Sequence, residues 1–157
     1  SQYNRWIKKD EKTFVLEQDK TLPQAIIVDV DGTLAHMVNR SPFDWKKVGQ
    51  DEVDNTIADI VRLHANNGYK IIIVSGRDSV CYDETYQWLV DNNINFDVLF
   101  MRPEGDSRKD SLIKEEIFNG YIKDKFYVKF VLDDRNQVVD TWRKLGLKCL
   151  QVAPGDF

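Results

Sequence analysis

The sequence predicts an α/β fold of three layers, in which helices cover both faces of a mostly parallel sheet. Short apolar runs bounded by turn residues alternate along the chain with amphipathic segments of helical length. Such alternation is typical of strands joined by crossover helices, which place the strands parallel. The chain has 157 residues, of which 42% are hydrophobic and 31% are charged. A chain of this size and composition is expected to fold as one compact domain.

Five apolar runs are predicted to form the sheet. Residues 25–30 are too few for a helix and lie between Pro23 and Gly32, as is typical of a buried strand. The same reasoning predicts four later strands, at residues 69–74, 96–100, 128–132 and 148–152.

Four amphipathic segments are predicted to be the helices. In residues 51–67 apolar side chains recur at helical spacing, and Gly68 then provides a stop. The other helices are predicted at residues 82–92, 106–118 and 137–145. Residues 1–22 fit no such unit, so we expect an arm, an added strand or the end of a linker before one domain at residues 23–157.

The composition excludes several classes of protein. No apolar run approaches the roughly 18 residues that a membrane span needs, so we expect a soluble, intracellular protein with no membrane partner. The net charge of -4 argues against a protein that coats nucleic acid by bulk positive charge. Cys81 and Cys149 match no zinc motif and are predicted to be reduced thiols. His64 is predicted to be structural, whereas His36 could face a site.

Polar residues follow four of the predicted strands at the point where each strand ends. In an open parallel sheet, ligands bind beyond the carboxyl ends of the strands, so these residues are candidates for a site. Four carboxylates, one hydroxyl and two guanidinium groups gathered there would be a costly arrangement unless a divalent cation and an anion bind among them. The residues are Asp29, Asp31, Ser75, Arg77, Arg102, Asp133 and Asp134.

The DVDGT segment at residues 29–33 indicates more specific chemistry. The chain must bend where the strand ends, and Gly32 permits the backbone geometry of such a bend. Two carboxylates carried round one turn can act on the same substrate, one as a nucleophile and the other as a proton donor. The oxygen ligands that would suit Mg²⁺ come from Asp29, the Asp31 backbone carbonyl, and Asp133 or Asp134.

The order of these motifs resembles that of the haloacid dehalogenase-like phosphohydrolases, whose fold is a three-layer, Rossmann-like one. The shared features are DVDGT after a strand, a strand ending in Ser-Gly-Arg, a lysine-bearing helix and a strand ending in Asp-Asp. From Pro23 to the C-terminus, the segments VSGRDS, RPEGDSRKDSLIKEEIF, LDDRNQVVDTWR and QVAPGDF further resemble the phosphatase domain of the bifunctional polynucleotide kinase-phosphatases of T-even phages. No P-loop motif of a kinase occurs in the 157 residues, so the kinase half is expected to be absent from this chain.

The resemblance implies a role for each motif residue. Asp29 matches the nucleophile that forms an aspartyl-phosphate, and Asp31 matches the general acid and base. The metal motif, completed by Mg²⁺, matches Asp29, Asp31, Asp133 and Asp134. The residues that match phosphate or substrate contacts are Arg40, Ser75, Gly76, Arg77, Arg102, Asp110 and Lys114.

The lysine of the third motif has two candidates. Lys109 has the position that the general family spacing suggests, at the start of the predicted helix. Lys114 lies four residues after Asp110, so the two share a helix face and can form an ion pair that orients the ammonium group. We favour Lys114, and interpret Asp106 as a cap of the helix N-terminus.

Aromatic residues beside the motifs are candidates for contact with a nucleobase. Phe43, Trp45 and Tyr82 flank the first and second motifs, and a base could stack on such rings. Trp88 and Trp142 fall on helical patterns and are predicted to lie in the core.

The function that the resemblance implies is a Mg²⁺-dependent polynucleotide 3′-phosphatase that heals DNA or RNA ends, with 2′-phosphates and 2′,3′-cyclic phosphates as further substrates. It also implies an N-terminal 5′-kinase domain in the full-length protein and a phage protein in the bacterial cytoplasm, and it leaves a homo-oligomer open. One alternative is a phosphatase of nucleotides or other small molecules, but the insert at residues 34–50 is too short for a separate cap and leaves the site open. Another alternative is a phosphoacceptor signalling module. Such a module needs no general acid two residues after its aspartate, so the D-x-D-G-T spacing argues against it.

Overall fold

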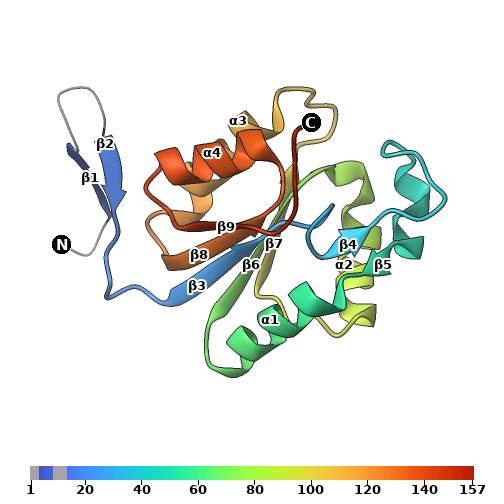
Figure 1. Cartoon of the computed structure of the whole chain (residues 1–157), viewed down its shortest axis with the longest axis horizontal. Coiled ribbons are helices and arrows are strands. Elements are labelled where there is room, and N and C mark those ends of the chain that lie inside the picture. The colour runs from blue at the N-terminus through green and yellow to red at the C-terminus, as the bar shows by residue number, and fades with distance from the viewer. Residues whose placement is uncertain (1–3, 9–13) are drawn as a thin grey trace.

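The computed structural model describes residues 4–8 and 14–157 and centres on a parallel sheet of five strands (Figure 1). The strands are β3 (Gln24–Val28), β6 (Lys70–Asp78), β7 (Val98–Arg102), β8 (Tyr127–Asp133) and β9 (Cys149–Gln151). Their order across the sheet is β7-β6-β3-β8-β9, so the first of them in the chain lies at the centre. The predicted α/β fold with a parallel sheet is confirmed.

Two pairs of helices cover the two faces of this sheet (Figure 1). The helices are α1 (Asn55–Asn66), α2 (Tyr82–Asp91), α3 (Asp110–Ile117) and α4 (Asn136–Lys144). Along β3, Ala25 and Ile27 pack into the core under α3 and α4, while Ile26 and Val28 pack into the core under α1 and α2. Successive side chains of a strand point to opposite faces, so a strand buried on both faces is apolar throughout.

Short elements fill the connections. The strands β4 (Ala35–His36) and β5 (Glu52–Val53) pair antiparallel, and three-residue-per-turn helices span Trp45–Gln50 and Ser79–Cys81. A π-helical turn at Phe118–Ile122 follows α3. Among the described residues, no helix is both long and apolar enough to cross a bilayer.

Two helices begin later than their patterns predict. The first was expected from residue 51, but α1 starts at Asn55 because the Asp54 carboxylate caps it by accepting a hydrogen bond from the Ile57 amide at 3.1 Å. The helix expected from residue 106 starts at Asp110. Asp106 instead accepts hydrogen bonds from the backbone and side chain of Arg108, so the prediction that it caps the helix is wrong.

The described part of the N-terminal segment is a hairpin. Strands β1 (Arg5–Lys8) and β2 (Phe14–Glu17) pair antiparallel in a two-stranded sheet of their own. The amide of Leu16 donates to the Leu145 carbonyl at 3.1 Å, and the Gln18 side chain bonds both backbone polar groups of Val128. On the other side, Lys123 Nζ lies 5.5 Å from the centre of the Trp6 ring in β1, so both strands of the hairpin contact the domain. The remaining residues of the predicted arm, 1–3 and 9–13, lie outside the described part of the chain.

Three predictions on single residues are confirmed by the packing. Trp88 and Trp142 are buried in the two cores. His64 is structural, because its Nδ1 lies 2.8 Å from the Ile60 carbonyl and its ring packs edge-on against two aromatic rings, those of Tyr69 and Phe130.

Replacing Asp54 with Ala is expected to lower the free energy of unfolding by about 1 kcal/mol at neutral pH, because the N-cap of α1 is lost. The hydrogen bond from His36 lowers the pKa of Asp54, so its contribution is full above the unfolded-state pKa of about 3.9 and is lost as the pH falls through the folded-state pKa. Urea unfolding at pH 7 and in acid measures this difference. Asp59→Ala, on the exposed face of the same helix, is the control that should change little.

Candidate active site

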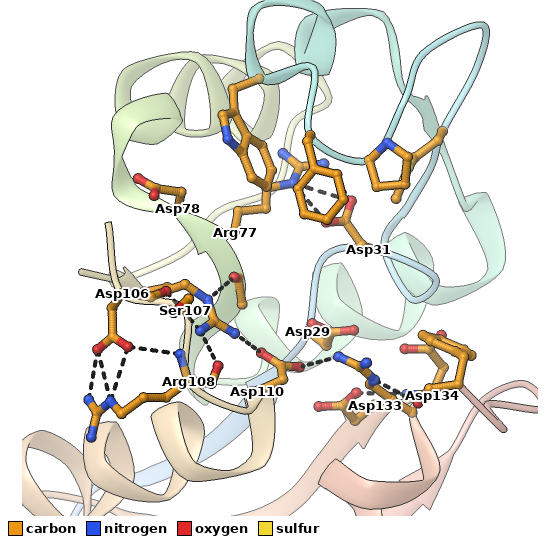
Figure 2. Close-up of a pocket in the computed structure, with 18 of the residues that line it drawn as sticks. Asp29, Asp31, Arg77, Asp78, Asp106, Ser107, Arg108, Asp110, Asp133 and Asp134 are labelled. Atoms are coloured by element: carbon orange, nitrogen blue, oxygen red, sulfur yellow. Dashed lines mark hydrogen bonds and ion pairs between the residues drawn. The ribbon is translucent and has the colours of Figure 1, made fainter. Parts of the chain in front are cut away.

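The carboxyl ends of β3, β6, β7 and β8 meet at a pocket of about 850 Å³. Asp29 directly follows β3, and Asp133 ends β8. Ser75, Gly76 and Arg77 lie within the end of β6, which runs further than its apolar pattern predicts. The motif residues predicted from the sequence that line the pocket are Asp29, Asp31, Gly76, Arg77, Arg102, Asp110, Asp133 and Asp134. Figure 2 labels all of them except Gly76 and Arg102.

A buried lysine joins two of the carboxylates. The Nζ atom of Lys114, on α3, donates to Asp29 Oδ1 at 2.8 Å and to Asp133 Oδ2 at 3.0 Å. The Lys114 side chain is only 1% exposed. Because an unpaired charge in such a place is strongly destabilising, the lysine and the carboxylates stabilise one another. Lys109, the other candidate, precedes α3 and is exposed.

Burial and charge shift the pKa values of these groups. Burial raises the pKa of Asp29 well above its ordinary value, the neighbouring Asp133 carboxylate raises it further, and the ammonium of Lys114 opposes both. Burial pulls the pKa of Lys114 down, but the surrounding carboxylates, Asp133 first among them, outweigh it and hold this pKa well above its usual range. Lys114 is therefore a cation at neutral pH. Burial likewise raises the pKa of Asp134.

Three buried carboxylates form a group that fits a divalent cation. One oxygen each from Asp29, Asp133 and Asp134 lies within 4.8 Å of the others. Asp133 is further oriented by the Trp142 indole, whose Nε1 donates to Oδ2 at 3.2 Å. Several carboxylates beside a single ammonium leave excess negative charge, and hard oxygen donors suit Mg²⁺. The Asp31 side chain lies elsewhere, so a metal contact from its backbone carbonyl stays a prediction.

On the other wall of the pocket, Asp51 joins two arginines. Arg40 donates to both carboxylate oxygens of Asp51, from Nε at 2.7 Å and from Nη2 at 2.8 Å. Arg77 Nη2 donates to Asp51 Oδ2 at 2.7 Å. We call Arg40, Asp51 and Arg77 the arginine cluster; their side chains are buried. Sequence analysis missed Asp51, because it was interpreted as the first residue of a helix and carries no motif.

Asp31 covers the arginine cluster on the side of the pocket. Its carboxylate accepts hydrogen bonds from Arg77, the shortest from Nη2 at 2.8 Å (Figure 2). Arg40 Nη2 lies 3.6 Å from Asp31 Oδ1. The Asp31 side chain is 29% exposed, whereas the two guanidinium groups are buried. Arg40, predicted to contact phosphate, thus lies behind Asp31.

Residues of β6 and α2 support the arginine cluster. Thr85 Oγ1 accepts from Arg77 Nη1 at 3.0 Å, and the Trp88 indole donates to the Asp51 carbonyl at 2.8 Å. Ser75, predicted to contact phosphate, is buried and its Oγ accepts a hydrogen bond from the Arg77 amide. The guanidinium of Arg77 is therefore fixed from several sides.

Three basic side chains lie close to the Asp110 carboxylate, which lines the pocket. Lys114 Nζ and Arg135 Nη1 each lie 3.8 Å from Asp110 Oδ2, and Arg102 Nη2 lies 3.5 Å from Oδ1. A Cβ atom at Gly76 would lie 1.9 Å from Asp110 Oδ1, so any larger residue at this position would displace the Asp110 carboxylate. Arg135 was missed by sequence analysis; its place directly after the Asp133-Asp134 pair is the signal that could have found it.

The remaining candidates are placed as follows. Phe43 and Trp45 line the pocket, with ring centroids 6.2 Å apart, and Phe43 is 80% exposed. Tyr82 instead packs against Tyr86 on α2. His36 turns its Nε2 toward Asp54, at 2.9 Å, and not toward the pocket.

A parallel sheet with DVDGT after its central strand, a Ser-Gly-Arg strand end, a buried lysine and paired aspartates defines a haloacid dehalogenase-like phosphatase. Within this class, a family model described as the polynucleotide kinase PNKP phosphatase domain matches residues 23–157. The chain belongs to this family.

The chain is similar to parts of longer proteins. A protein of Autographa californica nuclear polyhedrosis virus, described as a candidate bifunctional polynucleotide kinase/RNA ligase, is 37% identical in an alignment 152 residues long. The alignment covers 93% of this chain and 22% of that protein. A chain in the structure of the Pnkp1/Rnl/Hen1 RNA repair complex is 41% identical with a TM-score of 0.88, covering 95% of this chain and 48% of that one. The chain thus spans less than half the length of these relatives.

A more distant structure shares the fold. D,D-heptose 1,7-bisphosphate phosphatase from B. bronchiseptica, complexed with magnesium and phosphate, has a TM-score of 0.57 at 13% identity. The match covers 83% of this chain and 80% of that one.

Replacing Lys114 with Met is expected to lower the free energy of unfolding by about 3 kcal/mol, because Asp29 and Asp133 stay buried without their cation. Added Mg²⁺ should raise the Tm of this variant more than that of the wild type, since it restores the missing positive charge. Scanning calorimetry with and without Mg²⁺ measures both effects. Lys109→Met is the matched control for an exposed lysine; equal stability of the two variants would contradict the role of the buried one.

Proposed function

We propose that the chain is a Mg²⁺-dependent polynucleotide 3′-phosphatase, which removes the 3′-phosphate from DNA or RNA ends through an aspartyl-phosphate on Asp29. A 2′-phosphate or a 2′,3′-cyclic phosphate of RNA is a further substrate of the same site. The product is a 3′-hydroxyl end that a ligase or polymerase can use, so the reaction heals nucleic-acid ends.

One observation carries the proposal: the Asp29 carboxylate lines the pocket, is held there by the buried Lys114, and shares the pocket with Arg77 of the arginine cluster. Its oxygens are held by Lys114 at 2.8 Å and by the Thr33 hydroxyl at 3.2 Å. A nucleophile that is fixed in this way needs little reorganisation when it attacks. The family match supports a polynucleotide as the source of the phosphate.

In the first step, a carboxylate oxygen of Asp29 attacks the phosphorus atom, and the bond from phosphorus to the 3′-oxygen of the sugar breaks. Asp31, two residues further along the turn, gives a proton to that leaving oxygen. Arg77 and Lys114 stabilise the charge that develops on the transferring phosphoryl group. The polynucleotide then leaves with a free 3′-hydroxyl.

In the second step, water attacks the phosphorus atom of the aspartyl-phosphate. Asp31, now a carboxylate, takes a proton from this water, the bond between phosphorus and Asp29 breaks, and inorganic phosphate leaves. Mg²⁺ would be held by Asp29, Asp133 and Asp134, where it supplies positive charge for the phosphate oxygens. Asp110 keeps the ammonium of Lys114 and the guanidinium of Arg102 at the edge of the pocket.

The shape of the pocket favours the end of a polymer over an enclosed small molecule. The segment that could cover it, residues 34–50, contains only β4 and a short helix. The exposed ring of Phe43 and the half-buried ring of Trp45 on this segment offer an apolar surface to the terminal nucleoside. The polynucleotide kinase named in the viral relative supports a kinase domain in the full-length protein, which we propose to be an N-terminal 5′-kinase. The RNA repair complex of the other relative supports a role in nucleic-acid repair, which we place in the cytoplasm.

Replacing Asp29 with Asn is expected to lower the rate of phosphate release from a 3′-phosphorylated oligonucleotide by at least about 10⁴-fold, because the nucleophile is removed. The effect of Asp31→Asn should depend on the leaving group. An aryl phosphate, whose leaving oxygen needs no proton, should still phosphorylate Asp29 and give a burst of the aryl alcohol. Acid-quench assays with both substrates measure this. Turnover by the Asp29 variant would rule out the covalent mechanism.

Chelation of divalent cations is expected to abolish phosphate release, and Mg²⁺ to restore it. A 3′-phosphorylated dinucleotide should be hydrolysed with a higher kcat/KM than the matching 3′-mononucleotide, because the open pocket binds the neighbouring nucleotide. Matched DNA and RNA dinucleotides compare the two sugars. Preference for the mononucleotide would favour a small-molecule phosphatase instead.

A further inference from the structure

The arginine cluster contains a carboxylate for which the mechanism has no use. Asp51 is buried, lies behind Asp31 as seen from the pocket, and contacts both arginines at 2.7 to 2.8 Å. A buried carboxylate repels an anion that binds nearby, so it lowers the affinity of such a site unless it also positions the groups that bind the anion. What Asp51 does in the structure is hold two guanidinium groups in one place.

The charges of this wall are balanced before any substrate arrives. Two guanidinium groups face two carboxylates, Asp51 behind them and Asp31 in front. Of the four side chains, Asp31 alone is substantially exposed, at 29%. A phosphate in the pocket therefore meets Asp31 before it meets Arg77, and two anions cannot share the same donors without strong repulsion.

We propose that Asp51 is a positioning residue that holds Arg40 and Arg77 as a phosphate clamp, and that Asp31 occupies this clamp until the phosphate of the substrate displaces it. The proposal rests on the phosphatase function proposed above. Exchange of Asp31 for phosphate leaves Arg77 bonded to Asp51 and Thr85, so the guanidinium stays in place while its front partner changes.

Displacement of Asp31 from Arg77 by the substrate phosphate also makes Asp31 available as the proton donor. While Asp31 accepts hydrogen bonds from Arg77, it cannot give a proton to a leaving oxygen (Figure 2). Displacement by phosphate frees the Asp31 carboxylate when a substrate is present, and the freed carboxylate takes up a proton from the solvent before it acts as an acid. Asp31 is thus released beside the sugar oxygen that it must protonate.

Asp31 and Asp51 have the same charge, but their removal is expected to change phosphate affinity in opposite directions. The test therefore separates positioning from a simple charge effect. Asp31→Asn removes the competitor and should tighten the binding of inorganic phosphate by about tenfold, since a charge-assisted pair no longer has to break. Asp51→Asn removes the support and should weaken it by about tenfold. If these carboxylates act only through their charge, both substitutions tighten binding.

Isothermal titration calorimetry with inorganic phosphate, at one pH and in the presence of Mg²⁺, measures these affinities. Asp44→Asn is the matched control, since Asp44 lies on the same segment and pairs with Lys47 at the surface; phosphate affinity should not change. Thr85→Val removes the Arg77 Nη1 acceptor without any change of charge, and should weaken phosphate binding by roughly threefold even if Asp51→Asn does not fold.

Tighter binding by Asp51→Asn, or an unchanged affinity in Asp31→Asn, overturns the proposal. If Asp51→Asn does not fold, an unchanged affinity in Thr85→Val overturns it. The titration needs no nucleic acid and no turnover, so a protein without 3′-phosphatase activity can still confirm the clamp. If the wild type releases phosphate from 3′-phosphorylated oligonucleotides but the substitutions leave its affinity for inorganic phosphate unchanged, the clamp is wrong and the proposed function stands.

Discussion

The ion pairs of Lys114 with Asp29 and Asp133 are the interaction on which the site depends. Each partner is buried, and none could keep its charge there without the others. The helix α3 places Lys114, the end of β3 places Asp29, and the end of β8 places Asp133. The three elements must therefore be packed correctly before the charges can balance, and the balance in turn holds them together.

The pocket separates two electrostatic tasks on opposite walls. The carboxylates that attract a cation lie with Lys114, while the guanidinium groups that attract an anion lie with Asp51. Phosphate transfer needs both, because its substrate is an anion that binds together with a metal ion. An acidic chain is thus compatible with the proposed polyanionic substrate, since three of its carboxylates are gathered at one group that fits a cation.

The sequence predicted the residues at strand ends and missed those that act between elements. The five strands alternate with helices, so Asp29, Arg77 and Asp133 were expected at one edge of the sheet. Asp51 could not be found in this way, because its partners Arg40 and Arg77 are 11 and 26 residues away and meet it only in the folded chain. Local spacing also cannot show that residues 103–109 form a loop.

The N-terminal segment shows a similar limit. Its strands are short and carry no motif, and their hairpin is fixed by backbone contacts with residues far along the chain, such as the one from Leu16 to Leu145. Apolar patterning predicts which residues enter a core, but it says nothing of a backbone bond to a distant carbonyl. Asp106 is a further case, because a nearby arginine competes with the helix for its carboxylate.

The two walls of the pocket are attached to different layers of the fold. Lys114 and Trp142 come from the helices on one face of the sheet, whereas Thr85 and Trp88 come from α2 on the other. A phosphate that binds between the walls, as proposed above, would therefore connect the helices on the two faces of the sheet. Phosphate binding would then stabilise the folded domain, and phosphate release would lower its stability again.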